Sequence, residues 1–358
     1  MPVIWMIDAY RAGERAQVRA LVDTLAETLG WEVEIIKLQY RPGVFLPQLL
    51  RQTSLRGISS DSAARLQAPW PELIVSCGLR NEPVCRWIRQ QSGAYSRYLH
   101  LGRPWAPLDS FDLIVTTPQY RFPDRANVVN NTLTLHGITA QRLAQARQRW
   151  EAEFAALPGP HIAVIVGGDS GPFTFGPRAA RRLAREASAM ARQSGASLLI
   201  STSSRSSAAA MAALQAELDV PNYFYRWQPD DPANPYLGML ASADQLIVTG
   251  DSIAMLSEAC ATGKPVHIFD LGGMREDHQV AVDFRLGALL YGWLMRYCWQ
   301  ALSRDICLVH QQLLQSGRAC WLGDSVIPPG SVSSDDMDAS VAAVRTLLGE
   351  PAVAGTVE

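Results

Sequence analysis

Residues 249–266 read TGDSIAMLSEACATGKPV, and this stretch decides the fold class. It follows an apolar strand and leads into a second one at Val266–Phe269. Between the two strands, Met255–Ala261 has the composition of a helix, which Gly263 ends and Pro265 cannot continue. A helix between two nearly continuous apolar strands predicts parallel strands in a sheet that is covered on both faces.

The same alternation of strands and helices runs through the rest of the chain. The 358 residues exceed one ordinary domain, and the pattern stops once, at Leu157-Pro158-Gly159-Pro160, before it restarts. We therefore expect an α/β protein with two Rossmann-like domains, an N-terminal one over 1–157 and a C-terminal one over 158–332. Residues 333–358 predict a terminal helix and tail.

Composition and charge exclude several classes of protein. Apolar residues make up 48% of the chain, so large buried cores are feasible, and the net charge of −2 does not fit a nucleic-acid binder. The first half is slightly basic and the second is acidic, which fits either an anionic partner of the first half or ordinary drift between domains. The six cysteines form no CxxC pair and the start shows no signal peptide, so we expect reduced thiols and a cytoplasmic location.

The most apolar stretch is LGALLYGWLMRYCW, residues 286–299. It is too short to span a membrane, and it is interrupted by Arg296. The stretch therefore predicts either a core helix or a peripheral contact with a membrane surface.

A glycine-rich loop, Gly167-Gly168-Asp169-Ser170-Gly171, follows the apolar strand Ile162–Val166. Glycines allow a ligand to approach the backbone closely, and free N–H groups at the start of the next helix attract phosphate. The loop matches neither GxGxxG nor a P-loop, so a simple tight turn is the alternative interpretation. The following helix carries four arginines on one face, which would either meet an anion or form a solvated face paired with Glu186: Arg178, Arg181, Arg182 and Arg185.

Residues 249–266 contain a second group of candidates. Asp251 and Ser252 lie where the N-cap of the helix belongs. Glu258 lies inside an otherwise apolar helix, on the same side as Met255, where capping does not require a charge. A carboxylate there is suited to hold the ribose diol of a nucleotide, and a purely structural role is the alternative.

The run from Asp251 to Pro265 resembles the donor-site segment of GT-B glycosyltransferases, in which a Glu on this helix holds the nucleotide ribose. The loop Gly167–Gly171 resembles the glycine loop of the same fold. A closer resemblance, to the mitochondrial fission Elm family and its bacterial relatives, covers most of the chain. It is carried by residues 249–266 and by several shorter matches: Arg80, Asp112–Tyr120, Asn127-Val128, Ser204-Arg205, Asn234-Pro235-Tyr236 and Ala243-Asp244.

The chain departs from this family at one point. The family pattern there resembles SRRT, whereas residues 204–207 read SRSS, so Ser206 and Ser207 replace an Arg and a Thr. If both arginines of the family bind diphosphate, this chain has one fewer. Bacterial members often carry the label nucleoside-diphosphate-sugar epimerase, but this sequence shows neither a TGxxGxxG fingerprint near its start nor a convincing YxxxK pair.

The resemblance implies a GT-B-like fold, in which two Rossmann-like domains face each other across a cleft and the terminal helix crosses back to the N-terminal domain. It also implies a nucleotide-sugar as donor substrate in the C-terminal domain, with no cofactor and no metal. The residues expected to contact this donor are Gly167, Gly168, Asp169, Ser170, Ser204, Arg205, Asp251, Ser252, Met255, Glu258 and Lys264.

The acceptor side of such a protein lies in the N-terminal domain, in the loop and helix after the first strand. Asp8 ends that strand and is our candidate for the general base that deprotonates the acceptor. Capping of the next helix is the alternative role for Asp8, and His100 and His136 are rival bases. The other acceptor-side candidates are Arg11, Gly13, Gln17 and Glu14, the last of which is also a rival base.

Two classes of function stay open. The first is a metal-independent glycosyltransferase that acts on a lipid or lipopolysaccharide acceptor of the cell envelope, either cytoplasmic or peripheral at the inner face of the inner membrane. The second is a non-catalytic adaptor that keeps the fold and is related to mitochondrial fission factors. The acidic groups Asp230-Asp231 and Glu276-Asp277-His278 lack the sequence context of a metal site.

Overall fold

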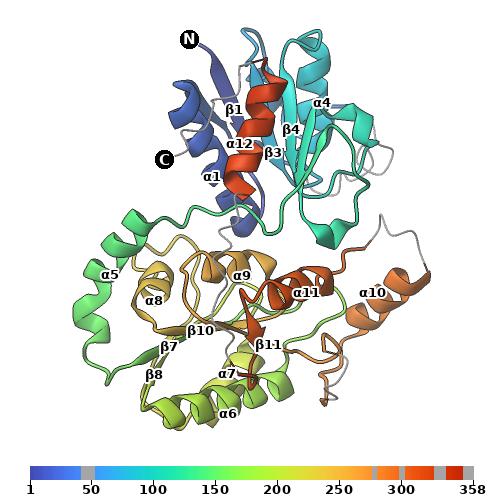
Figure 1. Cartoon of the computed structure of the whole chain (residues 1–358). Coiled ribbons are helices and arrows are strands. Elements are labelled where there is room, and N and C mark those ends of the chain that lie inside the picture. The colour runs from blue at the N-terminus through green and yellow to red at the C-terminus, as the bar shows by residue number, and fades with distance from the viewer. Residues whose placement is uncertain (42–52, 276–279, 298–302, 326–335, 350–358) are drawn as a thin grey trace. The chain divides into compact units, whose positions relative to one another are not determined.

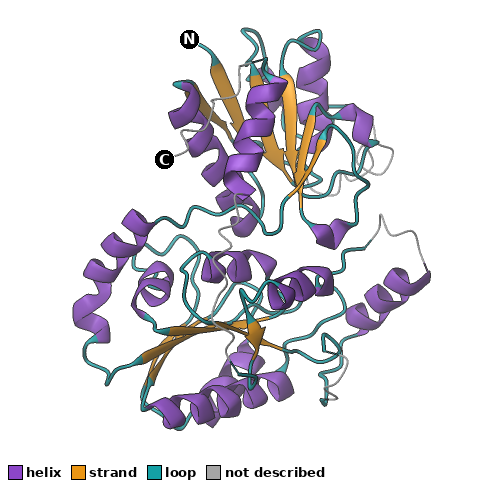
Figure 2. Ribbon diagram, viewed as in Figure 1, coloured by secondary structure: helices purple, strands orange, loops and turns teal. Residues whose placement is uncertain are grey.

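The computed structural model describes residues 1–41, 53–275, 280–297, 303–325 and 336–349. The chain forms two compact units, one of Met1–Gly137 with the C-terminal segment Ser334–Glu358, and one of Ile138–Ser333. Each unit has a six-stranded parallel sheet with helices packed on it (Figure 1, Figure 2). The expected fold class, an α/β protein of two Rossmann-like domains, is confirmed.

The sheet of the first unit has the order β2-β1-β3-β4-β5-β6, and every neighbouring pair of strands is parallel. Helices α1 and α12 cover one face, where Leu21 and Val344 are buried, and α4 covers the other, where Ile88 is buried. The strands are β1 (Val3–Ile7), β2 (Glu32–Ile36), β3 (Leu73–Cys77), β4 (Arg97–Leu101), β5 (Leu113–Thr116) and β6 (Val128–Asn130). The helices are α1 (Ala12–Leu29), α3 (Ser60–Ala64), α4 (Glu82–Gln91) and α12 (Asp336–Leu347), with short 3-10 turns at Leu108–Ser110 and Pro118–Tyr120.

The first helix forms where the apolar spacing predicts it. Val18, Leu21, Val22 and Leu25 recur at intervals of three and four residues, and all four are buried against the sheet. Gly30 ends the helix in the left-handed conformation, with φ at 67°, which a residue without a Cβ adopts at little cost.

The sheet of the second unit has the order β12-β11-β10-β7-β8-β9, again with all neighbours parallel. Counted from its own first strand, this is the strand order of dinucleotide-binding Rossmann domains. The strands are β7 (His161–Ile165), β8 (Ser197–Ser201), β9 (Asn222–Tyr225), β10 (Gln245–Thr249), β11 (Val266–Phe269) and β12 (Cys320–Trp321). The helices are α5 (Ala140–Phe154), α6 (Pro177–Ser194), α7 (Ala208–Glu217), α8 (Tyr236–Ser242), α9 (Ile253–Cys260), α10 (Leu286–Tyr297) and α11 (Cys307–Gln315).

The change of unit lies before α5, between Gly137 and Ile138, whereas the Pro-Gly break at residues 157–160 had placed it after this helix. Helix α5 packs on α8 of the second unit, where the ring of Trp150 lies against Gly238 and stacks on Phe154. The break therefore ends a helix inside the second unit. Proline and glycine end a helix wherever they occur, but membership of a unit depends on where the apolar side chains of that helix are buried.

The terminal helix α12 belongs to the first unit. The Asp336 carboxylate accepts hydrogen bonds from the backbone N–H groups of Thr132 and Leu133, at 2.8 and 2.9 Å. The Asn131 amide donates to the hydroxyl of Ser340 at 2.9 Å, in a buried contact. The chain thus returns to its first sheet at its C-terminal end, which fits the crossing-back that the GT-B resemblance implies.

The apolar stretch that begins at residue 286 forms α10, which the structure describes from Leu286 to Tyr297. None of these residues is buried, so the interpretation as a core helix is wrong. Among the residues that the structure describes, no helix is both long enough and apolar enough to cross a membrane.

We predict that Gly238→Val lowers the free energy of unfolding by about 1–3 kcal/mol. A Cβ at this position would collide with the ring of Trp150, so the α5–α8 packing would have to open. Chemical denaturation monitored by circular dichroism measures the change. Gly292→Ala is the matched control, because a Cβ there meets no atom of the described chain within 4 Å. Equal stability of the two variants would contradict the assignment of α5 to the second unit.

Candidate functional site

The two motifs of the second unit meet at the carboxyl edge of its sheet. Strand β7 lies between β8 and β10. The chain adds β8 and β9 on one flank of β7, and then β10, β11 and β12 on the other flank. The loop Gly167–Gly171 follows β7, and Gly250–Ser252 follows β10. In open parallel sheets this reversal of strand order is the place where ligands bind.

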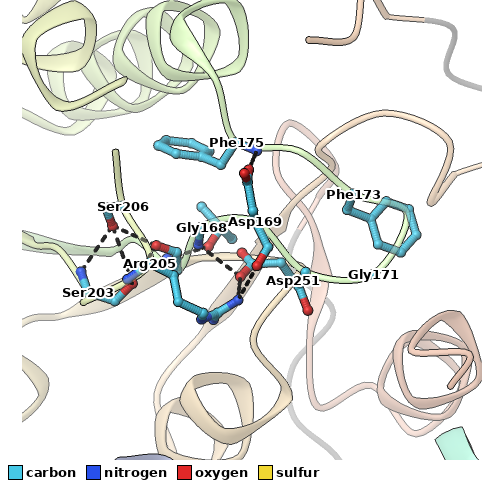
Figure 3. Close-up of polar contacts among 12 residues, drawn as sticks. Gly168, Asp169, Gly171, Phe173, Phe175, Ser203, Arg205, Ser206 and Asp251 are labelled. Carbon is cyan, nitrogen blue, oxygen red and sulfur yellow. Dashed lines mark hydrogen bonds and ion pairs between the residues drawn. The ribbon is translucent and has the colours of Figure 1, made fainter. Parts of the chain in front are cut away.

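A buried carboxylate joins these two loops (Figure 3). Asp251 is 1% exposed, and its Oδ2 accepts a hydrogen bond from the backbone N–H of Gly168 at 2.9 Å. The same oxygen pairs with the Arg205 guanidinium at 2.8 Å. A Cβ on Gly167 would collide with the Asp251 carboxylate, and one on Gly168 would collide with the backbone of Arg205. Both glycines are therefore required by packing within the chain, independently of any ligand.

A third loop, which follows β8, is hydrogen-bonded to the glycine loop Gly167–Gly171. The hydroxyls of Ser203 and Ser206 both donate to the carbonyl of Gly167, at 2.5 and 2.6 Å. The Arg205 side chain also donates to the carbonyl of Asp169 at 3.1 Å, whereas Ser204 is exposed. The serine that replaces the family's second arginine thus fastens the glycine loop. Its neighbour Ser207 caps α7, accepting a hydrogen bond from Ala210 N–H.

Burial raises the pKa of Asp251, and the Arg205 guanidinium and the N–H of Gly168 offset part of this rise. Its second oxygen, Oδ1, makes no hydrogen bond to any residue that the structure describes. A carboxyl group in this setting is held in place by its partners and is poorly hydrated. It therefore fixes Arg205 and the glycine loop, rather than capping α9 as the sequence had indicated.

The backbone donors expected to hold phosphate are engaged within the chain. Gly167 N–H donates to Thr249 Oγ1 at 2.8 Å, and Gly168 N–H donates to Asp251. The Asp283 carboxylate caps the first turn of α6, accepting from the N–H groups of Arg178 and Ala179 at 3.1 and 2.9 Å. The expectation that these groups are free is wrong, because the structure supplies each of them with an oxygen from a distant part of the chain.

Three arginine side chains surround the glycine loop instead. Besides Arg205, the Arg285 guanidinium lies 3.4 Å from the Asp169 carboxylate and donates to the carbonyl of Gly171 at 2.6 Å. Arg304 donates to the hydroxyl of Ser170. Guanidinium groups bind phosphate through paired hydrogen bonds, so an anion site here would be built from side chains. Sequence reasoning missed Arg285 and Arg304, because they are more than a hundred residues from the loop in the chain.

Two of the four arginines of α6 have acidic partners within the chain, and one of these partners is Glu186, as the second sequence interpretation expected. Arg182 lies 3.3 Å from Glu186 and donates to the carbonyl of Asp270. Arg185 pairs with Glu217 at 3.3 Å, and Arg178 and Arg181 are exposed.

Glu258 and Met255 are half-buried on α9. The hydroxyl of Tyr236, from the Asn-Pro-Tyr motif at the start of α8, donates to the Glu258 carboxylate. Burial raises the pKa of Glu258, and this hydrogen bond lowers it in part. Ser252 takes the N-cap position of α9 and is buried. In the sequence, Tyr236 is only part of a motif that matches the family. Its hydrogen bond to Glu258 was not expected from the sequence.

Lys264 lies at the other edge of the sheet, just before β11. Its ammonium donates to the carbonyls of Leu240 and Ala241 at 2.8 and 2.7 Å, at the C-terminal end of α8. Burial lowers its pKa to about 8. Lys264, expected from the sequence to contact the donor, is therefore a helix cap in this structure.

In the first unit, Asp8 follows β1 next to β3, where the strand order of that sheet reverses. Its carboxylate pairs with Arg15 at 2.7 Å, and its carbonyl accepts a hydrogen bond from the Asn81 amide at 3.1 Å. The N-cap of α1 is Arg11, so the alternative role of Asp8 as the cap of that helix is wrong.

The other acceptor-side candidates gather around the start of α1. Glu14 lies 3.7 Å from the exposed Arg11, and a Cβ on Gly78, after β3, would approach the Glu14 carboxylate to 2.8 Å. Gly13 is exposed in the first turn and Gln17 is half-buried in the second. Sequence reasoning missed the exposed Tyr10, whose ring lies 4.1 Å below the guanidinium of Arg80.

The rival bases differ in their exposure. His100 is fully buried and its Nδ1 is hydrogen-bonded to the hydroxyl of Tyr98 at 2.9 Å. Burial lowers its pKa to about 4, so it is a core histidine without access to a substrate. His136 is half-buried.

No group of three or more metal-binding side chains occurs within the described ranges. Asp231 accepts hydrogen bonds from the hydroxyl of Tyr225 and the N–H of Ala233, which gives it a role in its loop. Residues 276–278, the other acidic group of the sequence, lie outside the described residues.

The family model for mitochondrial fission ELM1 matches residues 12–283. The chain belongs to the mitochondrial fission ELM1 family. It is 28% identical over 239 residues to mitochondrial fission protein ELM1 of Arabidopsis thaliana, covering 61% of this chain and 56% of that protein. The chain thus spans little more than half the length of this family member. It is 26% identical over 301 residues to protein RP120 of Rickettsia prowazekii, covering 74% of this chain and 82% of that protein.

Solved structures of other proteins share the fold of this chain. The structure of Staphylococcus aureus MnaA with UDP matches with a TM-score of 0.50 and 12% identity, over 99% of this chain and 100% of that chain. At this identity the match establishes the fold alone, which is the GT-B-like pair of Rossmann-like units that the sequence predicts.

We predict that Glu258→Gln changes the pH dependence of stability. Because the folded state raises the pKa of Glu258, the ionised carboxylate is less stable in the folded protein than in the unfolded chain. The wild type should therefore lose stability relative to the variant as the pH rises through the raised pKa, and the two should converge at lower pH. The glutamine carbonyl can still accept from Tyr236. A difference in unfolding free energy between the two proteins that stays the same at every pH would contradict this account.

Proposed function

We propose that the second unit binds a nucleotide-sugar and that the protein transfers the sugar to a lipid or lipopolysaccharide acceptor of the cell envelope. The observation that carries this proposal is the buried bonding of Asp251 to Gly168 and Arg205. These contacts bring three loops and the Arg205 side chain together at the carboxyl edge of the sheet. The strand order of this Rossmann-like sheet reverses at that point.

The roles in the donor pocket follow from the chemistry of each side chain. Arg205, with Arg285 and Arg304 beside the same loop, supplies positive charge for a diphosphate and for the charge that develops as it leaves. Glu258, oriented by Tyr236, accepts from the ribose hydroxyls. Cationic side chains take the place that a metal ion has in other transferases. UDP is the first nucleotide to test, because MnaA, which shares the fold, has a structure with UDP.

A second candidate function is a non-catalytic adaptor. It is favoured by the engagement of Gly167 N–H, Gly168 N–H and the first turn of α6 within the chain, and by Ser206 in place of an arginine. The name of the Arabidopsis relative, a mitochondrial fission protein, fits this candidate. Tight donor binding without turnover on any envelope acceptor would favour it over the transferase.

We predict that Arg205→Ala weakens the affinity for UDP-sugars by about tenfold or more, because a charge-assisted contact to the diphosphate is lost. Calorimetry against UDP-, GDP-, ADP- and CMP-sugars first identifies the base that the wild type prefers. The variant should bind the corresponding nucleoside, which has no phosphate, as the wild type does.

Arg181→Ala is the control for this measurement, since Arg181 is exposed on α6 and outside the loop cluster. Thermal unfolding of both variants checks that the loss of the partner of Asp251 has not unfolded the unit. Unchanged affinity of a folded Arg205→Ala protein would contradict the diphosphate role. The same titrations with Glu258→Gln test the ribose role, since discrimination between UDP and dUDP should disappear.

We predict that Asp8→Asn lowers kcat by about 100-fold or more while donor affinity is kept, as removal of a general base does. The carboxylate of Asp8 accepts the proton of the acceptor hydroxyl in this proposal, and the asparagine amide does not. The measurement is sugar transfer to a lipid or lipopolysaccharide acceptor by the purified protein.

Glu14→Gln is the matched control for the Asp8 variant, because Glu14 is the neighbouring half-buried carboxylate. A large loss of kcat in Glu14→Gln with none in Asp8→Asn would transfer the base role to Glu14. Equal and small effects of both would exclude a base at this loop.

A further inference from the structure

Helix α10 and the segment before it hold most of the large apolar side chains that are strongly exposed in the described chain. Their exposed fractions run from 53% to 80%. They are Val282, Phe284, Leu286, Leu289, Leu290, Trp293 and Tyr297. Figure 1 shows α10 at the rim of the second unit, apart from its sheet.

The exposed side chains of α10 form one stripe. Leu286, Leu289, Leu290, Trp293 and Tyr297 are separated by three and four residues, so they lie on one face of the helix. In a soluble domain such a stripe normally faces the core. Here it faces outward, and a stripe of this kind requires an apolar environment outside the unit.

Contacts on the opposite side hold α10 in this orientation. The ring of Tyr291 lies against Gly171, and its hydroxyl accepts a hydrogen bond from Arg304 N–H at 2.9 Å. Just before the helix, Arg285 donates to the carbonyl of Gly171, and Asp283 caps α6. The face of α10 opposite the apolar stripe is therefore attached to the glycine loop. This attachment directs the stripe away from the unit.

The charges of this segment match an anionic lipid surface. The sequence from Phe284 to Tyr297 contains no acidic residue. Arg296 is exposed and lies three residues after Trp293, so its long side chain borders the stripe. Tryptophan and tyrosine prefer the boundary between lipid headgroups and acyl chains, and arginine beside them can reach the phosphates.

We propose that α10 lies in the interfacial layer of a membrane that contains anionic lipid, with its apolar stripe among the upper acyl chains. This places the loop Gly167–Gly171 at the membrane surface, where a lipid-borne acceptor is available. The membrane contact does not depend on the proposed transferase activity. Vesicle binding is measured without nucleotide, so failure of one proposal is distinguishable from failure of the other.

The test is flotation of the full chain with vesicles of phosphatidylcholine, alone or mixed with phosphatidylglycerol. The wild type should float with the mixed vesicles, and the double variant Leu290→Ser with Trp293→Ser should bind at least about tenfold more weakly, since two apolar anchors are removed. Tyr95→Ser is the matched control, because Tyr95 in the first unit is 57% exposed, as Trp293 is. This control should bind as the wild type does.

A second variant separates charge from apolar insertion. Arg296→Glu should weaken binding to the mixed vesicles by about fivefold or more, with a smaller effect on phosphatidylcholine alone. Circular dichroism and thermal unfolding show whether each variant is folded. If the double variant does not fold, Arg296→Glu still tests the proposal, because Arg296 lies on the surface of the helix.

Three results would overturn the proposal. The first is equal flotation of the wild type and the folded double variant. The second is absence of vesicle binding together with a concentration-dependent dimer, seen by ultracentrifugation, that the double variant loses; the stripe would then bind a second copy. The third is a lowered melting temperature of the double variant without any vesicle binding by the wild type, which would show that the chain itself covers the stripe.

Discussion

The ion pair and hydrogen bond of the buried Asp251 carboxylate hold together the three loops of the candidate functional site. Asp251 and Gly168 are 83 residues apart in the chain. Burial of a carboxylate costs several kcal/mol unless charge and hydrogen bonds compensate it, and here Arg205 and a backbone N–H do so. Removal of the Arg205 side chain would leave the buried carboxylate with the backbone N–H of Gly168 as its compensation. The close approach is feasible only because Gly167 and Gly168 have no Cβ that would collide with these groups.

This constraint changes the meaning of the glycine loop. In many nucleotide-binding proteins a glycine loop presents free N–H groups to phosphate. Here Thr249, Asp251 and the loop after β8 bind the backbone groups of Gly167 and Gly168, and the arginines that contact the loop come from other segments. A phosphate site made of Arg205, Arg285 and Arg304 would depend on side-chain geometry, which the buried carboxylate and the attachment of α10 both fix.

The same attachment connects the candidate site to a surface. Arg304 and Tyr291 contact each other, and both contact the glycine loop, so the position of α10 and the shape of the loop are coupled. An apolar stripe attached directly to the candidate site is consistent with the proposed lipid acceptor. Membership of the mitochondrial fission ELM1 family leaves both the transferase and the adaptor as functions to be separated by experiment.

The sequence by itself determined the elements and the fold class, because apolar periodicity, helix-ending glycines and the motif at residues 249–266 act over a few neighbouring residues. It also identified Gly167, Gly168, Arg205 and Asp251, which the structure joins in one cluster, and Glu258 on the helix that follows Asp251. Only the tertiary structure decided the strand order, the unit that takes α5, the helix-capping role of Lys264 and the partners Arg285, Arg304 and Tyr236. These depend on contacts between residues far apart in the chain, where the burial of a side chain such as Trp150 or the pairing of a charge such as Asp251 is set by packing that no local pattern encodes.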